Sequence, residues 1–329
     1  MGTISLGAGS VEVVDRIPLT GGDGLSGSAL ARLVLADGRV LIEKRVSPTL
    51  DWIMRATHDA GRAATLWTTG VLDSVPEVID HTVVGAEPDG DGWLVFMRDA
   101  SDALVPEGRV LTRAESSAIL AAATELHERF LGERLPGLCS LADRYATLSP
   151  ATGQREAGGP NTIPNQLGRG WERFAEGVAA DVAGAVLAIL DRPWLLADEL
   201  ESCDCTLLHG DLKMGNLGIA GERVVMLDWG NWTGFAPPAV EFAWYLAVNW
   251  SRIAASREQL VEDFRRHAGK RHDERALRLA LIGGLVQLGW NKALDAAEHP
   301  DPATRAREAA DLDWWVARAR QGLELWSPL

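Results

Sequence analysis

Two short polar motifs, joined by an apolar hairpin pattern, constrain the fold of this chain more than any other feature. In the first motif, His209 and Asp211 flank a glycine and Asn216 follows, which gives the spacing H-G-D-x-x-x-x-N. The second motif is an apolar run that ends in Asp-Trp-Gly, with its aspartate at Asp228. Surface acids in an ordinary loop are the alternative interpretation, but four specified residues at fixed spacing favour a functional site.

The segment between the motifs predicts a β-hairpin. Two apolar arms, residues 217–219 and 223–227, flank a turn that contains Gly221, where a positive φ is easily adopted. A hairpin brings its two ends together, so we expect the two aspartates and the asparagine of the motifs to converge.

Two carboxylates and a carboxamide at one point suit a Mg²⁺ site. Mg²⁺ prefers oxygen ligands and keeps waters and substrate phosphates in its other positions. A carboxylate that does not bind the metal can accept a proton from an alcohol. These groups are the working parts of a phosphoryl-transfer enzyme, in which positioning and charge neutralisation provide most of the catalysis.

The two motifs resemble the catalytic and metal-binding segments of the aminoglycoside phosphotransferase and choline kinase-like family, whose members are distant relatives of protein kinases. By this resemblance, Asp211 is the catalytic base, and Asn216 and Asp228 hold Mg²⁺. The resemblance also implies that His209 braces the catalytic loop from behind. Lys213 follows Asp211 by two residues, as the phosphate-contacting lysine does in many protein kinases.

The resemblance implies an α+β, bilobal protein-kinase-like fold. Residues 1–98 would form a small β-rich nucleotide-binding lobe, and residues 99–329 a larger, mainly helical catalytic and substrate-binding lobe. A length of 329 residues agrees with about two domains. Within the second lobe, residues 149–170 are rich in Gly, Pro, Asn and Thr and predict a long loop, which is either a substrate lid or a disordered segment.

A glycine-rich segment separates the first two long strands expected in the first lobe, residues 11–17 and 29–35. Such a strand-turn-strand can lay its backbone N–H groups over phosphates without side-chain clashes, and a flexible hairpin is the alternative. By resemblance, the segment is the nucleotide-positioning loop. Its candidate nucleotide-binding residues are Gly22, Gly24, Ser26 and Gly27.

The third expected strand, residues 40–46, carries Lys44 on one face among three aliphatic residues. The family places its phosphate-binding lysine in this strand, which makes Lys44 the candidate. Arg45 lies on the opposite face, which mixes polar and apolar side chains and suits solvent. A further strand, residues 93–97, ends at Met97, where the resemblance implies a hinge whose backbone meets the adenine.

Residues 50–69 predict a single helix with an apolar stripe. Kinase-like folds usually supply a glutamate from this helix to orient the lysine. This segment has no glutamate, and its only acids are Asp51 and Asp59. Either Asp59 pairs with Lys44 over a shorter reach, or the ion pair is missing.

The formal net charge of −14 argues against a nucleic-acid partner bound through its phosphates. It permits a cationic substrate, and acids near the C-terminus could bind amino groups, although solvated helix faces explain most of them. Three cysteines do not make a disulfide framework. We find no secretory signal and no apolar run long enough to span a membrane, so a cytoplasmic location without a membrane partner is expected.

We therefore predict transfer of the γ-phosphoryl group of ATP or GTP to a hydroxyl of a small molecule. The short segment after Asp228 leaves no room for a protein-kinase activation segment, and Trp229 and Trp232 could wall the acceptor pocket. An aminoglycoside or other antibiotic, a sugar, a nucleoside and an amino alcohol all remain open as acceptors. A nucleotide-binding pseudokinase, which the missing helix glutamate favours, and a metal-dependent phosphohydrolase are the alternative functions.

Overall fold

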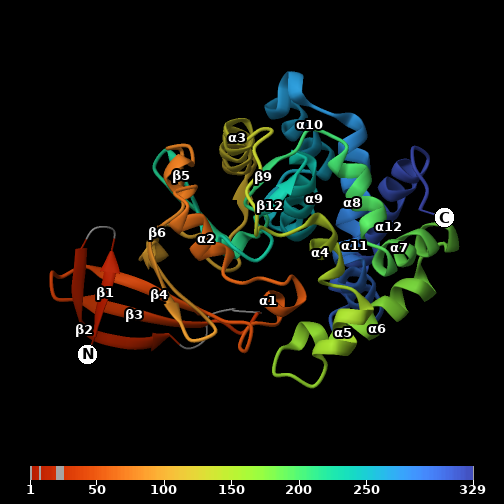
Figure 1. The fold of residues 1–329 in the computed structure, drawn as a ribbon. Helices are drawn as coiled ribbons and strands as arrows, with labels where there is room; N and C mark the ends of the chain where they lie inside the picture. Colours follow the sequence, from red (N-terminus) through yellow and green to blue (C-terminus); the bar gives the residue numbers. More distant parts are fainter. Residues whose placement is uncertain (1, 7–8, 20–25, 329) are drawn as a thin grey trace.

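A rolled β-sheet and a larger helical part lie at opposite ends of the molecule (Figure 1). The computed structural model describes residues 2–6, 9–19 and 26–328. The sheet has the order β1-β2-β3-β4-β7-β6, and all neighbouring strands are antiparallel. Its strands are β1 (Thr3–Leu6), β2 (Gly9–Leu19), β3 (Ala29–Leu35), β4 (Val40–Val46), β6 (Val83–Asp89) and β7 (Gly92–Arg98). The strands expected over residues 11–17, 29–35, 40–46 and 93–97 are therefore confirmed.

One face of this sheet encloses a small apolar core of its own. Leu33, Leu41 and Phe96 are buried there. The sheet rolls until β1 approaches β6, where the amide of Ser5 donates to the carboxylate of Glu87. The prediction that the face of β4 bearing Arg45 suits solvent is wrong, because rolling covers all of that face except Arg45 itself.

The single helix predicted over residues 50–69 is also wrong. The structure has α1 (Trp52–Ala56) and α2 (Arg62–Thr68), each capped separately. Asp51 accepts hydrogen bonds from the first amides of α1, and Asp59 accepts from the amides of Gly61 and Arg62. Gly61 has φ +113°, and a Cβ there would lie 2.2 Å from Trp93, so the residue before α2 must be glycine.

Helices make up most of the second part, and α11 runs through its middle against α6, α9 and α12 (Figure 1). The helix α3 begins with a capping box, in which Thr112 and Glu115 bond each other's backbone. The helices are α3 (Arg113–Arg129), α4 (Leu141–Ala146), α5 (Pro150–Glu156), α6 (Thr162–Gly177), α7 (Ala180–Asp191), α8 (Trp194–Glu201), α9 (Pro238–Asn249), α10 (Arg257–Ala268), α11 (Glu274–Glu298) and α12 (Pro302–Leu323).

The long loop predicted over residues 149–170 is instead α5 and the first half of α6. Ser149 caps α5 through the amide of Thr152, and a proline occupies the first turn, where it is tolerated. In α6, Gly170 has no side chain, so the helix can approach α11, where a Cβ would lie 2.7 Å from the carbonyl oxygen of Trp290. Glycine-rich composition was therefore a misleading signal, because Gly153 and Gly170 permit close packing of helices, while Gly158 and Gly159 lie in the short connection between α5 and α6.

The two parts share backbone pairing and an apolar core. β5 (Ile79–Asp80), which precedes residue 98, pairs in parallel with β11 (Arg223–Met226) of the motif hairpin. A single buried cluster includes residues from both parts, such as Val95 and Leu207. Arg55 of α1 also pairs with Glu156 of α5. A domain boundary at residue 98 remains a prediction.

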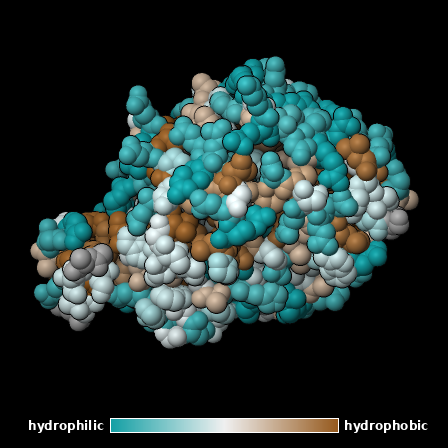
Figure 2. Space-filling model, turned by 45° about the horizontal axis from the view of Figure 1, so that its top comes forward, coloured by the Kyte–Doolittle hydropathy of each residue, from teal (hydrophilic) through white to brown (hydrophobic). Residues whose placement is uncertain are grey.

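Hydrophilic residues cover most of the face seen in Figure 2, and hydrophobic residues are scattered between them. Among the helices in the described ranges, none combines the length and the apolar character needed to cross a membrane.

Candidate active site

The two motifs lie at the ends of the predicted hairpin. The strand β9 (Thr206–Leu208) leads into the first motif, and a 3-10 turn (Met214–Asn216) leads out of it. The hairpin pairs β10 (Leu217–Ala220) with β11, which returns the chain to the second motif. At its open end, the amide of Leu227 donates to the carbonyl of Asn216 over 2.8 Å. The predicted hairpin is confirmed.

The carboxylate of Asp211 is held on both of its oxygens. Its side chain is buried, and Oδ2 accepts a hydrogen bond from Nδ2 of Asn216 at 3.0 Å. The ammonium of Lys213 lies 3.1 Å from the same oxygen. The indole N–H of Trp244 donates to Oδ1 at 3.0 Å. Three donors from different positions in the chain therefore set the orientation of this carboxylate.

Lys44 and Asp228 form an ion pair between the rolled sheet and the second motif. Burial acts to raise the pKa of Asp228, but the charges of Lys44 and Lys213 outweigh it and lower this pKa to about 2. Asp211 and Asp228 together raise the pKa of Lys213, Asp211 more strongly, although burial opposes them. Asp228 has φ +68°, a left-handed conformation that is uncommon for a residue other than glycine.

His209 is buried, and its two ring nitrogens have different partners. Nε2 lies 2.9 Å from the carbonyl oxygen of Leu227, which can only accept, so Nε2 carries the proton. Nδ1 accepts from the amide of Asp211 at 3.2 Å. These contacts specify the neutral Nε2–H tautomer, and burial lowers the pKa of the ring below its ordinary value.

Glu241 of α9 reaches the catalytic loop, a contact that sequence reasoning missed. One carboxylate oxygen accepts from the amide of Gly210 at 2.6 Å, and the other pairs with Nε2 of His127 at 2.8 Å. Burial acts to raise the pKa of Glu241, but its hydrogen bonds and nearby imidazoles outweigh it and lower the pKa. Its place in the first turn of α9 also suits the helix dipole, which gives no sign of this contact.

Asp59 does not pair with Lys44 in the described part of the chain. Its Oδ1 accepts the amides that begin α2, and its Oδ2 lies 3.6 Å from the guanidinium of Arg62. Arg62 in turn donates to the carbonyl of Asn231 at 3.0 Å and so joins α2 to the segment after Asp228. The acid that meets Lys44 comes from the second motif, not from the helix.

Part of the predicted nucleotide loop can be placed. Gly22 and Gly24 lie outside the described residues. Ser26 is buried, and its hydroxyl is 3.4 Å from that of Ser28. Gly27 has φ +104°, and a Cβ there would lie 2.4 Å from the carbonyl oxygen of Leu50, so this position requires glycine. The loop therefore ends tightly against the start of α1.

A pocket of roughly 440 Å³ lies between the sheet and the second motif. Lys44 and Asp228 form its charged side, and Met97 belongs to an apolar side completed by Val46, Val83 and Val95. Met97 pairs with Ile42 in the sheet and is nearly buried. A pocket lined by both apolar and charged side chains suits a base joined to phosphates.

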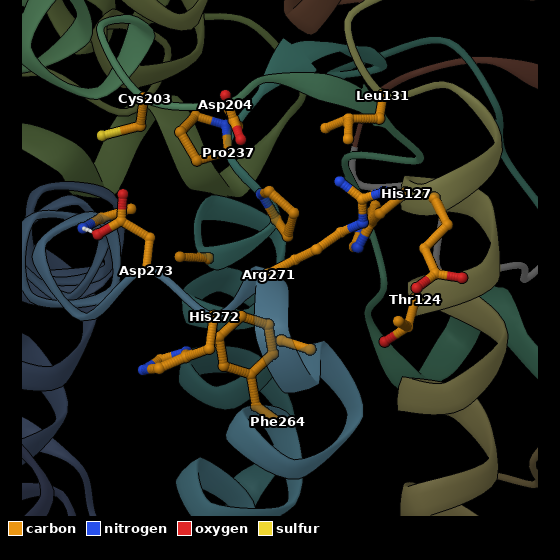
Figure 3. Close-up of a pocket in the computed structure, with 15 residues that line it drawn as sticks. Thr124, His127, Leu131, Cys203, Asp204, Pro237, Phe264, Arg271, His272 and Asp273 are labelled. Carbon is orange, nitrogen blue, oxygen red and sulfur yellow. Dashed lines mark hydrogen bonds between the residues drawn. The ribbon is translucent and has the colours of Figure 1, made fainter.

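A larger pocket, of roughly 700 Å³, lies at the start of α9, where Pro237, Pro238 and Ala239 line it. Figure 3 shows the side chain of Arg271 crossing it toward His127, with Phe264 forming part of its wall. None of the residues predicted to act in catalysis lines it. Lys44 and Asp228, both predicted site residues, line the smaller pocket instead.

Two side-chain oxygens of the motifs are available to a metal ion. Within the described ranges, no cluster of three or more His, Cys, Asp and Glu side chains forms a metal site. In the same ranges, Oδ1 of Asn216 and Oδ2 of Asp228 accept no hydrogen bond. Two protein oxygens, completed by phosphates and waters, fit the way in which Mg²⁺ usually binds.

The two tryptophans expected to wall an acceptor pocket are both buried. Trp229 packs edge-on against His209 at 4.6 Å between ring centroids and lines the smaller pocket. Trp232 packs edge-on against Trp244 at 4.8 Å and donates to the hydroxyl of Thr147. Trp232 therefore contributes to the layer beneath the catalytic loop.

The acids that could have bound amino groups of a substrate are mostly engaged within the chain. Asp263 pairs with Arg113, and Glu298 pairs with Arg169 and Arg173. The remaining contacts of this kind are Glu258 with Trp314 and Asp295 with Asn291.

Comparison with known proteins gave one family and several similar folds. A sequence model described as the phosphotransferase enzyme family matches residues 28–279. No curated protein sequence matches the chain.

The structure resembles choline kinase LicA from Streptococcus pneumoniae, with 14% identity over 93% of this chain and 94% of that one, at a TM-score of 0.53. It also resembles an aminoglycoside phosphotransferase from Alicyclobacillus acidocaldarius, with 15% identity over 95% and 93% of the two chains, at a TM-score of 0.51. A thermostable mutant of aminoglycoside phosphotransferase APH(4)-Ia, solved with AMP-PNP and hygromycin B, has 16% identity over 93% and 95% and a TM-score of 0.51. At these identities the likeness establishes the protein-kinase-like fold alone.

Proposed function

The chain belongs to the phosphotransferase enzyme family, and we propose that it transfers the γ-phosphoryl group of ATP or GTP to a hydroxyl group of a small molecule. One observation carries this proposal. Lys44 from the sheet meets Asp228 of the second motif, beside the buried carboxylate of Asp211. The site therefore combines a phosphate-binding cation with a carboxylate placed to accept a proton.

In the proposed reaction, Asp211 accepts the proton of the acceptor hydroxyl as its oxygen attacks the γ-phosphorus and the bond to the nucleoside diphosphate breaks. Lys44 contacts the nucleotide phosphates, and Lys213 steadies the transferring group. Asn216 and Asp228 would hold Mg²⁺, which neutralises phosphate charge when bound. His209 keeps its neutral form and braces the loop between the amide of Asp211 and the carbonyl of Leu227.

The nucleotide would occupy the smaller pocket, with its base against Val83, Val95 and Met97 and its phosphates toward Lys44. Gly22 and Gly24 belong to the segment proposed to cover the phosphates, followed by Ser26 and Gly27. The solved relatives named above include one with a bound nucleotide analogue, which supports this assignment by analogy.

The acceptor is proposed as a class only. An aminoglycoside, another hydroxylated antibiotic, a sugar, a nucleoside and an amino alcohol share the required hydroxyl group. Since most of the candidate acids have partners within the chain, those acids give no support to a polycationic acceptor. A cytoplasmic location would supply the ATP or GTP.

Release of ADP from Mg-ATP across a panel of hydroxylated acceptors tests the function, with Asp211→Asn as the blank. We expect one acceptor class to raise the rate of ADP release in the wild-type chain and to have no effect in the variant. Equal rates in the two chains with every acceptor would contradict the proposal. Substituting GTP for ATP in the same assay identifies the donor.

A nucleotide-binding pseudokinase is the second candidate. It is favoured by the absence of an acid from α1 or α2 beside Lys44 within the described residues. Its signature would be Mg²⁺-dependent nucleotide binding, measured by calorimetry, together with no ADP release from any acceptor.

A further inference from the structure

The carboxylate of Asp211 accepts a hydrogen bond from an aromatic side chain that no sequence motif predicts. Trp244 lies on α9, more than thirty residues after Asp211, and its indole N–H donates to Oδ1 of that aspartate at 3.0 Å. An indole N–H is a donor only, and a hydrogen bond to an ionised carboxylate is stronger than one between neutral groups. The contact therefore helps to set the orientation of the Asp211 carboxylate.

The indole of Trp244 is itself fixed by its neighbours. Its side chain is buried and lies edge-on to Trp232, with an angle of 73° between the rings. The guanidinium of Arg144 lies 5.6 Å from the Trp244 ring and donates to the carbonyl of Gly210 at 2.7 Å. One packed layer thus contacts two consecutive residues of the catalytic loop.

The contacts of Asp211 leave one of its lone pairs available. An ionised carboxylate oxygen has two acceptor positions. Oδ2 already accepts from Asn216 and Lys213, whereas Oδ1 accepts only from Trp244 in the described part of the chain. The free position is therefore on Oδ1, beside the indole.

From this geometry we infer that Trp244 is a positioning residue, which orients Asp211 so that Oδ1 receives the proton of the acceptor hydroxyl. The inference rests on the proposed phosphotransferase function. The proton leaves the hydroxyl for Oδ1 as the alcohol oxygen bonds to the γ-phosphorus and the nucleoside diphosphate departs, and it passes afterwards to solvent. Trp244 keeps its own proton throughout and acts only through Asp211.

The alternative is that Asp211 merely satisfies a buried indole, since buried tryptophans usually find an acceptor. Trp171 separates these interpretations because it is also buried, but its N–H donates to the backbone carbonyl of Leu148, outside the catalytic loop. Trp244→Phe and Trp171→Phe each remove one buried indole N–H. Only the first removes a contact to the catalytic carboxylate.

The test compares kcat and KM for the two variants with the acceptor found in the panel, or with water as a slow acceptor in long incubations with Mg-ATP. We expect Trp244→Phe to lower kcat about tenfold or more, the usual effect of losing a hydrogen bond to a charged group. The KM for the nucleotide should stay within about twofold of wild type. Trp171→Phe should change kcat by less than about threefold. The inference is overturned if Trp244→Phe retains wild-type kcat, or if both variants lose activity equally.

Two further measurements distinguish loss of the hydrogen bond from misfolding of the variant. Benzothienylalanine introduced at position 244 removes the N–H with little change of shape, and it should lower kcat as much as phenylalanine does. In ¹H–¹⁵N spectra, the indole resonance that is missing in Trp244→Phe should move in Asp211→Asn, while that of Trp171 stays in place. An unmoved Trp244 resonance would contradict the contact. A wild-type chain that forms no ADP with any acceptor or with water overturns the proposed function. A Trp244→Phe variant with wild-type turnover overturns only the role of Trp244.

Discussion

Lys44 and Arg45 are adjacent in β4 but point to opposite faces of the sheet. Lys44 lies in the smaller pocket and pairs with Asp228, whereas Arg45 pairs with Asp89 and is half-exposed. The ion pair of Lys44 and Asp228 is partly buried and lies where a nucleotide would place its phosphates. Lys44 and Arg45, two adjacent cations, thus lie in quite different environments.

Lys44→Ala is expected to weaken nucleotide binding by about tenfold or more, because charge-assisted contacts to phosphate are lost. Arg45→Ala is the matched control and should leave the affinity within about twofold of wild type. Calorimetric titration with a non-hydrolysable ATP analogue and Mg²⁺ measures both. Equal losses in the two variants would argue against a specific role for Lys44.

His209 predicts a pH dependence of stability. Its folded pKa lies below the ordinary value because burial disfavours the charged ring. As the pH falls below about 6.5, the unfolded chain binds a proton that the folded chain does not, so the free energy of unfolding should decrease. His81 and His267 also have lowered pKa values, mainly through burial, and contribute with the same sign.

The ring of His209 can be followed directly by NMR, with His209→Gln used for assignment. We expect the signal of a neutral Nε2–H tautomer that persists below pH 6.5. Urea titrations between pH 7.5 and 5.5 should show a smaller pH dependence in His209→Gln than in the wild type. A His209 resonance that titrates at or above pH 6.5 would refute this prediction.

The catalytic loop depends on close backbone packing at Gly210. This residue has φ +92°, and a Cβ there would lie 2.3 Å from the carbonyl oxygen of Trp232. Its amide donates to Glu241, and its carbonyl accepts from Arg144. Both the conformation and the space require glycine.

Gly210→Ala should therefore lower the free energy of unfolding by about 1–3 kcal/mol or more, through backbone strain and displaced contacts. Gly215→Ala provides the control, because Gly215 lies in the same loop with nothing within 4 Å of an added Cβ and without a positive φ. Urea unfolding of the two variants at pH 7.5 makes the comparison. A control as unstable as Gly210→Ala would show that the loop tolerates no side chain at all.

Among larger elements, the errors of sequence reasoning have a common cause. The apolar stripe of residues 50–69 continues across the break between α1 and α2, because both short helices bury side chains against the same core. The polar, glycine-rich composition of residues 149–170 conceals α5 and α6, whose glycines permit close packing. Periodicity indicates which residues are buried, and composition indicates which residues favour turns. Neither shows where packing against a neighbouring element ends a helix.

The whole molecule is joined across the two parts by pairing of β5 with β11, by the shared core and by the ion pair of Arg55 with Glu156. Separation of the parts would expose apolar residues on both sides of the nucleotide pocket. We therefore expect thermal unfolding in one transition, with far-ultraviolet circular dichroism and tryptophan fluorescence changing together. Bound Mg-nucleotide should raise the midpoint of that transition. Two separated transitions would indicate lobes that fold independently.

The protein-kinase-like fold was predicted from the resemblance of the motifs to a known family. The amino-acid sequence by itself determined the two motifs, the hairpin between them and the strand of Lys44. It could do so because these features depend on local spacing and alternation. Tertiary structure alone decided that Lys44 meets Asp228, that Asp59 begins α2, and that Glu241 and Trp244 of α9 hold the amide of Gly210 and the carboxylate of Asp211. These contacts join residues that are distant in the chain. The local sequence around an acid or a tryptophan on a helix does not indicate which partner it will contact once the core is packed.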